Sequence, residues 1–207
     1  MKVFLINYGM GNLSSVKNTL EKLGVDAVIT DNPADLHEAD KVILPGVGSF
    51  GEGMQRLSSA GWIQALNSFV SQEKKPILGI CLGMQMLATT GHEGGITDGL
   101  GFVPGKVERL DNIGCQLRIP HVGWNDVAYT SDDMLFESIP SASDFYFVHS
   151  YAFIPNNQSH LIATASYGVE ITAAVRNGNV YGCQFHPEKS SKAGRHLLNN
   201  FLNYSAC

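Results

Sequence analysis

The sequence predicts an α/β fold, a three-layer sandwich with a mostly parallel, doubly wound central sheet and antiparallel additions. Strand-like apolar runs alternate with segments of helical spacing in the first half of the chain, which is typical of a parallel sheet with right-handed crossovers. The second half holds several strand-like segments in succession, including a hairpin, which predicts the antiparallel part. At 207 residues we expect one domain over residues 1–207.

The first half contains the repeated strand–helix units. Apolar runs predict four strands, at residues 3–7, 25–30, 41–45 and the segment after Pro76. Val16, Leu20 and Leu23 recur at helical spacing, and Gly24 ends that helix. A longer helical region follows the third strand, with a break at Gly61. Reactive groups are expected outside the carboxyl ends of these strands.

The second half is predicted to consist mainly of strands. They cover residues 102–110, 144–153, 161–167 and 171–185. Asn177-Gly178 divides the last of them into a hairpin. A terminal helix closes the fold, with Ala193, Leu197, Phe201 and Leu202 on one face.

Composition excludes several classes of protein. A formal charge of −5 and the lack of a Lys/Arg run give no reason to expect a nucleic-acid partner. No apolar segment is long enough to span a bilayer, and the N-terminal run meets Asn7 too soon for a signal peptide. The cysteines show neither metal spacing nor a disulfide pattern: Cys81, Cys115, Cys183 and Cys207. We expect a reduced, cytoplasmic protein with no metal, cofactor or membrane segment.

The segment Gly79-Ile80-Cys81-Leu82-Gly83 has the pattern of a nucleophile elbow. An apolar strand passes through Gly-x-Cys-x-Gly into good helix formers, and the glycines let the backbone bend while the thiol stays clear of it. The positive end of the following helix favours the thiolate form of Cys81. Because cysteine is among the most buried residue types, a small core residue is the alternative.

Near the C-terminus, a strand runs into His186-Pro187-Glu188. Residues two apart point to the same side of an extended chain, so His186 and Glu188 can lie side by side, and Pro187 stiffens that geometry. A carboxylate beside an imidazole can fix its tautomer and stabilise the imidazolium, which is the orienting role in a catalytic triad. The alternatives are an ordinary turn at a strand end, or a helix cap by Glu188.

The glycine loop after the third strand, residues 45–49, can complete an acyl-transfer site. Such a site needs two backbone N–H groups for the developing oxyanion, and we expect these at Leu82 and Val47. Each donor is worth on the order of 3 kcal/mol of barrier. A phosphate-binding loop is the competing interpretation, but the Gly-Lys-Ser/Thr ending is missing.

Three further segments have weaker signals. Residues 9–14 contain two glycines of a dinucleotide-binding pattern but not the third, so a tight turn capped by Asn12 or Ser14 is favoured. Residues 120–125 place Trp124 beside a glycine in a predicted loop, either as core or as an interface anchor. Residues 144–151 end in polar atoms suited to a substrate's head group, unless His149 is simply hydrogen-bonded within a strand.

The elbow at Cys81 and the His186-Pro-Glu188 segment together resemble the motifs of triad, or class I, glutamine amidotransferases, and the glycine loop fits as well. The resemblance runs nearly end to end. Within the family it is closest to the glutaminase subunits of imidazole glycerol phosphate synthase. The segments that carry this narrower resemblance are residues 11–13, 45–50, 121–125, 146–151 and 186–191.

The resemblance implies a role for each matched residue. Cys81 attacks the side-chain amide of glutamine, His186 protonates the departing ammonia, and Glu188 orients the histidine. Glutamine is held by Gly48, Gln85, His149, Ser150 and Tyr151. The ammonia passes to a (β/α)8-barrel cyclase subunit in a heterodimer, which makes imidazole glycerol phosphate and AICAR in histidine biosynthesis. We expect the partner to dock on the face that carries Asn12, Trp124 and Lys189.

Three alternatives remain open at this point. They are a thiol hydrolase or peptidase on the same fold, a non-enzymatic binding module that kept the elbow, and a glutaminase serving another synthase, such as the one that makes pyridoxal phosphate. We also expect the free subunit to hydrolyse glutamine poorly, because a flipped peptide at Val47 would point a carbonyl into the oxyanion site.

Overall fold

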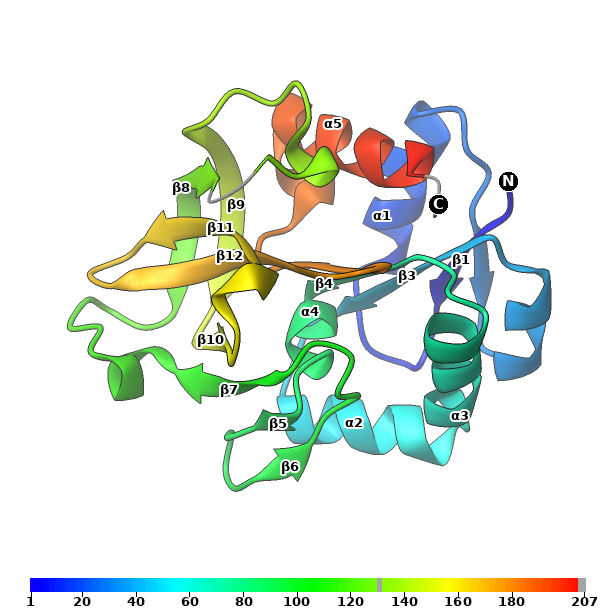
Figure 1. Cartoon of the computed structure of the whole chain (residues 1–207), viewed down its shortest axis with the longest axis horizontal. Coiled ribbons are helices and arrows are strands. Elements are labelled where there is room, and N and C mark those ends of the chain that lie inside the picture. The colour runs from blue at the N-terminus through cyan, green and yellow to red at the C-terminus, as the bar shows by residue number, and fades with distance from the viewer. Residues whose placement is uncertain (130–131, 205–207) are drawn as a thin grey trace.

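A nine-stranded sheet forms the middle layer of the computed structural model, which describes residues 1–129 and 132–204 (Figure 1). In sheet order its strands are β2 (Val28–Thr30), β1 (Val3–Ile6), β3 (Lys41–Gly46), β4 (Ile77–Cys81), β13 (Val180–Cys183), β12 (Glu170–Asn177), β11 (Leu161–Ser166), β8 (His121–Tyr129) and β9 (Ser143–His149). The five strands from β2 to β13 are parallel to one another, and those from β12 to β9 continue the sheet antiparallel. The predicted mixture of a parallel sheet with antiparallel additions is confirmed.

Helices cover both faces of this sheet (Figure 1). On one face lie α1 (Leu13–Lys22) and α5 (Ser191–Asn203); on the other lie α2 (Phe50–Ser59), α3 (Trp62–Asn67) and α4 (Leu82–Met86). Each face buries its own apolar cluster, one containing Leu20 and Phe201 and the other containing Leu57 and Trp62. The result is the predicted three-layer sandwich, whose parallel strands other than the edge strand β2 are buried on both faces.

Short helical turns complete the chain. The 3-10 turns cover Pro33–Glu38, Leu110–Ile113, Met134–Phe136, Gln158–His160 and Pro187–Lys189, and a π-helical turn covers Ser68–Gln72. The predicted helix break falls at Gly61, whose φ of +78° favours glycine. Asn12 caps α1 by accepting a hydrogen bond from the Ser15 amide at 3.4 Å. Of the two residues proposed for this cap, Asn12 and Ser14, the cap is therefore Asn12.

A second, smaller sheet was not predicted. Its four strands, in order, are β10 (Tyr151–Pro155), β7 (Gly105–Arg109), β5 (Thr90–Gly91) and β6 (Thr97–Asp98). It lies on the same side of the main sheet as α2 (Figure 1). The strands β5 and β6 have two residues each, which is too short for any alternation of polar and apolar side chains to show in the sequence.

Two sequence predictions are wrong. Residues 121–125 are not a loop but the start of β8, because they pair antiparallel with β9, with Trp124 opposite Tyr146. Residues 144–153 are not one strand. The chain leaves the main sheet after His149 and enters the smaller sheet at Tyr151, so that Ser150 lies between the two sheets.

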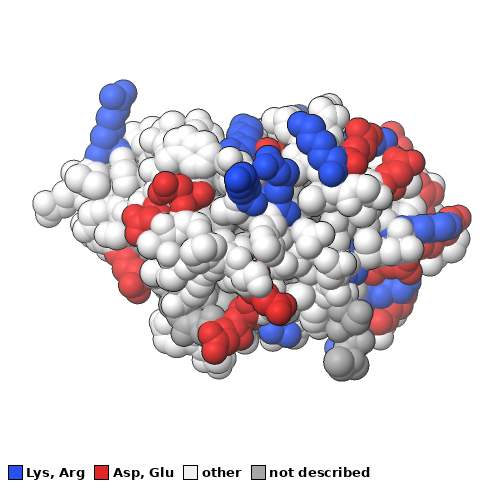
Figure 2. Space-filling model, turned by 90° about the horizontal axis from the view of Figure 1, so that it is seen from above, with Lys and Arg blue, Asp and Glu red and all other residues white. Residues whose placement is uncertain are grey.

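The surface formed by α1 and α5 is seen from above in Figure 2. Several Lys and Arg side chains lie near the middle of this face, with Asp and Glu side chains to the left, to the right and below them. Among the described helices, none combines the length and apolar character needed to cross a membrane. Cys81, Cys115 and Cys183 are buried and free, whereas Cys207 lies outside the described residues.

Candidate active site

The chain turns sharply at Cys81, where β4 ends and α4 begins. Cys81 has a φ of +55° and a ψ of −110°, a conformation that L-residues rarely adopt. Strain of this kind, on a non-glycine residue, is characteristic of functional sites. The side chain is 6% exposed and lies at the wall of a pocket. The strand–turn–helix geometry predicted for the elbow is therefore present.

The two glycines that flank Cys81 have a different role from the one expected. A Cβ atom on Gly79 would lie 2.6 Å from the carbonyl oxygen of Gly83, and one on Gly83 would lie 1.8 Å from the carbonyl oxygen of Leu44. Both positions need glycine because α4 packs directly against the backbone of β3 and β4. The bend itself is concentrated at Cys81.

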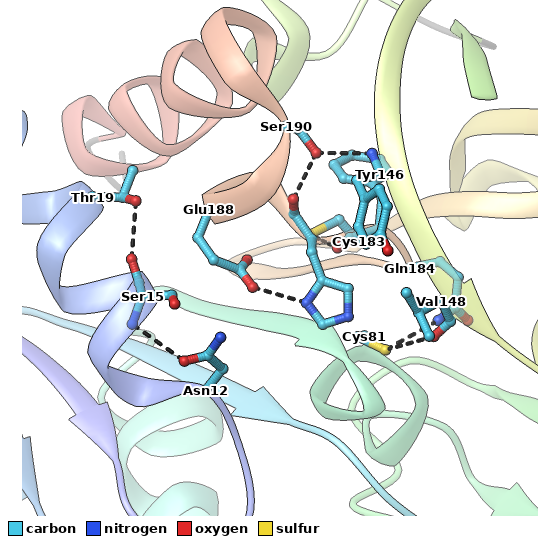
Figure 3. Close-up of polar contacts among 12 residues, drawn as sticks. Asn12, Ser15, Thr19, Cys81, Tyr146, Val148, Cys183, Gln184, Glu188 and Ser190 are labelled. Atoms are coloured by element: carbon cyan, nitrogen blue, oxygen red, sulfur yellow. Dashed lines mark hydrogen bonds and ion pairs between the residues drawn. The ribbon is translucent and has the colours of Figure 1, made fainter. Parts of the chain in front are cut away.

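His186 lies beside the elbow because β13 pairs in parallel with β4. Cys183 is opposite Ile80 in this register, so the two strands end at the same edge of the sheet. The imidazole Nδ1 lies 2.9 Å from Oε1 of Glu188, the bond marked at the Glu188 carboxylate in Figure 3. A carboxylate only accepts hydrogen bonds, so Nδ1 carries the proton and Nε2 is left for Cys81. The side chains of His186 and Glu188 are 5% and 1% exposed.

The backbone around His186 is held by hydrogen bonds to β9. The His186 amide donates to the carbonyl oxygen of Tyr146 at 2.8 Å. The Ser190 hydroxyl donates to the carbonyl oxygen of His186 at 2.6 Å and accepts from the Tyr146 amide at 3.0 Å (Figure 3). The imidazole is thus positioned by a strand as well as by its own turn.

The surroundings of His186 favour its charged form. Burial by itself would lower the pKa of this imidazole, but hydrogen bonds and charge interactions with Cys81 and Glu188 outweigh burial and raise the pKa to about 9. An imidazolium between a sulfur and a carboxylate is suited to thiolate chemistry.

The glycine loop lies next to the elbow. Gly46, at the end of β3, is opposite Cys81 in the register with β4, which brings Val47 and Gly48 to the pocket. Gly48 has a φ of +120°, so the loop turns there in a conformation that favours glycine. Leu82, which supplies the other expected amide, is the first residue of α4 and also lines the pocket.

A cavity of about 360 Å³ opens over Cys81. Its lining residues are Val47, Gly48, Cys81, Leu82, Gln85, Glu93, Pro120, Val148, His149, Ser150, Tyr151, His186 and Lys189. These include every residue expected in catalysis, in the oxyanion site and in glutamine binding except Glu188, which lies behind the imidazole. The structure therefore brings these sequence-predicted residues together in one place.

Two of the residues expected to hold glutamine are tied into the protein by their side chains. Gln85 Nε2 lies 3.0 Å from the carbonyl oxygen of Tyr151 and 3.0 Å from Oε1 of Gln184. His149 donates from Nδ1 to the same Tyr151 carbonyl at 2.8 Å, and its Nε2 lies 2.9 Å from Nδ1 of His121. Burial lowers the pKa of His149 to about 3, so its ring forms a neutral wall of the pocket.

Three pocket residues were not identified from the sequence: Glu93, Pro120 and Val148. Glu93 is the only Asp or Glu among the lining residues of the described structure, and its carboxylate accepts a hydrogen bond from the Phe50 amide at 2.8 Å. An acid inside a glycine-rich loop, residues 91–95, soon after the elbow helix was the signal that could have identified it. Pro120 and Val148 enter through tertiary packing alone.

The residues expected at a partner interface lie around this pocket. Trp124 is 54% exposed on β8, and its ring packs edge-on against Tyr146 at 5.9 Å between centroids. Lys189 places Nζ 5.9 Å from the same Tyr146 ring and also lines the pocket. Asn12 lies at the start of α1, below Glu188 in Figure 3. Trp124, Tyr146 and Lys189 therefore form one continuous strip of surface.

Comparison with known proteins gives consistent results. The family model for glutamine amidotransferase class-I matches residues 4–204. The chain is 44% identical over 199 residues to the imidazole glycerol phosphate synthase subunit HisH of Moorella thermoacetica, covering 96% of this chain and 93% of that protein. It is 42% identical over 207 residues to subunit HisH of Pelagibacter ubique, covering 98% and 100%.

Solved structures share the fold at lower identity. A crystal structure of a glutamine amidotransferase superposes with a TM-score of 0.77 at 21% identity, covering 98% of this chain and 97% of that one. A glutamine amidotransferase from Thermotoga maritima superposes with a TM-score of 0.66 at 19% identity, covering 98% and 83%.

Proposed function

The chain belongs to the class I glutamine amidotransferases, and on that basis we propose that it is the glutaminase subunit of an imidazole glycerol phosphate synthase. The observation that carries the chemistry is the strained elbow of Cys81 beside the buried His186–Glu188 pair. The observation that carries the narrower assignment is identity of 42–46% to HisH subunits over nearly the whole chain.

The first half-reaction forms a thioester. His186 holds the proton of the Cys81 thiol as an imidazolium, and the thiolate sulfur attacks the side-chain amide carbon of glutamine. The oxyanion is held by the amides of Leu82 and Val47. When the tetrahedral intermediate collapses, the C–N bond breaks, and the imidazolium gives its proton to the leaving nitrogen, which departs as ammonia.

The second half-reaction releases glutamate. His186 accepts a proton from a water molecule, which attacks the thioester carbon. The C–S bond breaks, the electron pair returns to sulfur, and glutamate leaves. Glu188 keeps the imidazole in one tautomer and stabilises its charged form in both half-reactions.

Glu93 has the chemistry to recognise the amino-acid end of glutamine. The free substrate carries an α-ammonium group, and Glu93 is the carboxylate in the pocket. Its hydrogen bond from Phe50 orients it from the N-terminus of α2. Ser150, between the two sheets, and Tyr151, at the start of β10, complete the head-group end together with Gly48, whereas Gln85 and His149 shape the wall.

The ammonia acceptor is proposed to be a (β/α)8-barrel cyclase subunit in a heterodimer, within the cytoplasm. Trp124, Val122 and Val148 are large apolar side chains that are 54%, 54% and 37% exposed. They lie on neighbouring strands, since Val122 is opposite Val148 and Trp124 is opposite Tyr146. An exposed apolar strip beside the proposed active site, with Lys189 next to it, fits a docked partner that receives the product.

Docking is further proposed to control turnover. Val47 is 45% exposed on the glycine loop, and Gly48 beside it tolerates conformations closed to other residues. Rotation of the peptide at Val47 exchanges an inward carbonyl for an inward N–H. A high glutaminase rate of the isolated chain would argue against this control.

The alternatives raised by the sequence are not favoured. The family match is to glutamine amidotransferases, not to peptidases, and the relatives named above are subunits of one synthase. A non-enzymatic module has no use for a strained thiol beside a buried imidazole that is paired with a carboxylate.

Ammonia release tests the proposal. Glutamine is supplied to the wild-type chain and to Cys81→Ala, each with and without the barrel cyclase. We expect release by the wild type, strong stimulation by the cyclase, and none above background from Cys81→Ala. Equal release by both chains would overturn the proposal.

A further inference from the structure

An amide side chain outside the triad faces the nucleophilic sulfur. Gln184 is 0% exposed, and its Nε2 lies 3.7 Å from Cys81 Sγ (Figure 3). Its Oε1 lies 3.0 Å from Nε2 of Gln85, which in turn lies 3.0 Å from the carbonyl oxygen of Tyr151. Neither the motif nor the proposed mechanism gives Gln184 a role.

This row of contacts determines which atom of Gln184 meets the sulfur. The Tyr151 carbonyl only accepts, so the Gln85 atom that faces it must be nitrogen. The second N–H of that nitrogen points at Gln184, which must therefore present its oxygen. The nitrogen of Gln184 is left facing Cys81 as a donor, and the reverse orientation would place two donors together at one end.

The sulfur has few other neighbours that stabilise negative charge. The carbonyl oxygen of Val148, 3.7 Å from Sγ, accepts a bond from the thiol but opposes the thiolate. Among the described groups whose pKa is shifted, three interact electrostatically with Cys81: His186 in the turn after β13, Tyr8 after β1, and Cys183 in β13. Burial raises the pKa of both Tyr8 and Cys183, so both stay neutral and supply no positive charge.

We propose that Gln184 donates a hydrogen bond to the Cys81 thiolate in both half-reactions, and that Gln85 acts as its positioning residue. In the first, the bond holds the negative sulfur formed when His186 takes the thiol proton. In the second, it stabilises the negative charge on sulfur when the C–S bond breaks and the electron pair returns to Sγ. The roles in turnover rest on the proposed glutaminase function, whereas the thiolate contact does not.

Alkylation of Cys81 by iodoacetamide, followed between pH 5 and 10 by mass spectrometry of its peptide, tests the contact without glutamine. Gln184→Met keeps the size but removes the donor. We expect its alkylation at pH 7 to be about tenfold slower, with the half-maximal pH about one unit higher and the same plateau at high pH. In Gln184→Glu the side chain still accepts a hydrogen bond from Gln85 but turns an oxygen to the sulfur. Its alkylation at pH 7 should therefore be slower than that of Gln184→Met.

An unchanged midpoint in both variants would overturn the proposal. A change in plateau without a change in midpoint would also overturn it, because the plateau reports access to the sulfur and not its ionisation. Gln64→Met, on the exposed side of α3, is the matched control and should leave both unchanged. If glutaminase activity were absent while the midpoint still moved, the proposed function would fail and the thiolate contact would stand.

The positioning role of Gln85 is tested in the same assay. Gln85→Met frees the amide of Gln184 to turn, so we expect alkylation at pH 7 to be about threefold slower. Because Gln85 acts only through Gln184, the same change in the Gln184→Met background should add nothing. If Gln85→Met slowed alkylation by the same factor in the wild-type chain and in Gln184→Met, the positioning role of Gln85 would be contradicted.

Discussion

At the scale of single residues, Glu188 has the most sharply defined contact in the site. One carboxylate oxygen accepts from His186, and the other, Oε2, is buried with no hydrogen-bond partner among the described residues. The acid therefore directs its polar contact at the imidazole. Glu188→Gln retains the shape but loses the charge, and kcat for glutamine hydrolysis is expected to fall on the order of 10²-fold or more.

The pH profile of this variant gives an independent check. Glu188 is one of the groups that raise the pKa of His186 to about 9, so its neutralisation lowers that pKa. The imidazolium is then lost at lower pH, and the alkaline limb of kcat/KM should move to lower pH in Glu188→Gln. An alkaline limb in the same place as in the wild type would show that Glu188 does not act on His186.

Glu93 is expected to act on binding and not on chemistry. Glu93→Gln keeps an oxygen for the Phe50 amide but loses the charge that attracts the α-ammonium of glutamine. We expect KM for glutamine to rise by about tenfold or more, with kcat within about threefold of wild type. Glu52→Gln, an exposed acid on α2, serves as the control in steady-state assays of ammonia release. A fall in kcat with constant KM would contradict this role.

Local motifs made some residues predictable and left others hidden. Cys81, His186 and Glu188 could be found because each depends on spacing within a few residues. Gln184 is only two residues from His186, yet the role proposed for it rests on contacts with Gln85 and Cys81, which come from other elements. Glu93 reaches the pocket through a loop whose path the sequence does not specify.

At the scale of elements, the β8–β9 pair contains two buried histidines that resist protonation. Burial lowers the pKa of His121 to about 4 and that of His149 to about 3. In the unfolded chain both titrate near 6.5, so between pH 6.5 and 4 the unfolded state binds more protons than the folded state. The free energy of unfolding must therefore decrease as pH falls through this range.

This predicts the behaviour of His121→Phe, which keeps a ring stacked between Phe147 and Tyr167. Urea unfolding at pH 7 and at pH 5 measures how much the free energy of unfolding decreases on acidification. We expect a smaller decrease in the variant than in the wild type. His37→Phe, at an exposed position, is the control and should lose as much as the wild type. If the free energy of unfolding decreased equally in all three proteins, His121 would not be a source of the acid destabilisation.

Helices and strands could be predicted where a single period of apolar residues dominated the segment. The strand–helix alternation of the first half gives β1, α1 and β3 correctly, since buried parallel strands and amphipathic helices differ in periodicity. The strand β8 was missed because Pro120 and Gly123 give residues 120–125 the composition of a turn, although Gly123 lies within the strand with a φ of +135°. The division at Ser150 was missed because β9 and β10 read as one run, and only pairing with β8 and β7 separates them.

At the scale of the whole molecule, the candidate active site opens beside the exposed apolar side chains that we propose as the partner surface. Trp124→Ala should weaken binding to the barrel cyclase by about thirtyfold or more, as expected for a central aromatic anchor. Titration calorimetry measures this Kd. Val28→Ala is the control, because Val28 is also exposed but lies on β2, at the opposite end of the main sheet. Equal affinity of wild type and Trp124→Ala would exclude Trp124 from the interface.

The arrangement of the whole chain explains why residues so distant in sequence share one pocket. β3, β4 and β13 are adjacent parallel strands, so the glycine loop, Cys81 and His186 all emerge at the same sheet edge. The sequence predicts this convergence from the fold class. It does not predict the smaller sheet, whose strand β10 begins at Tyr151, beside the pocket.

Trapping of the covalent intermediate tests the proposed chemistry most directly. The wild-type complex with the cyclase is mixed with ¹⁴C-glutamine, quenched in acid during turnover, and digested. We expect label on the peptide that contains Cys81, and none on this peptide in Cys81→Ala. Label on a different residue, or release of ammonia by Cys81→Ala at the wild-type rate, would contradict a thioester at Cys81.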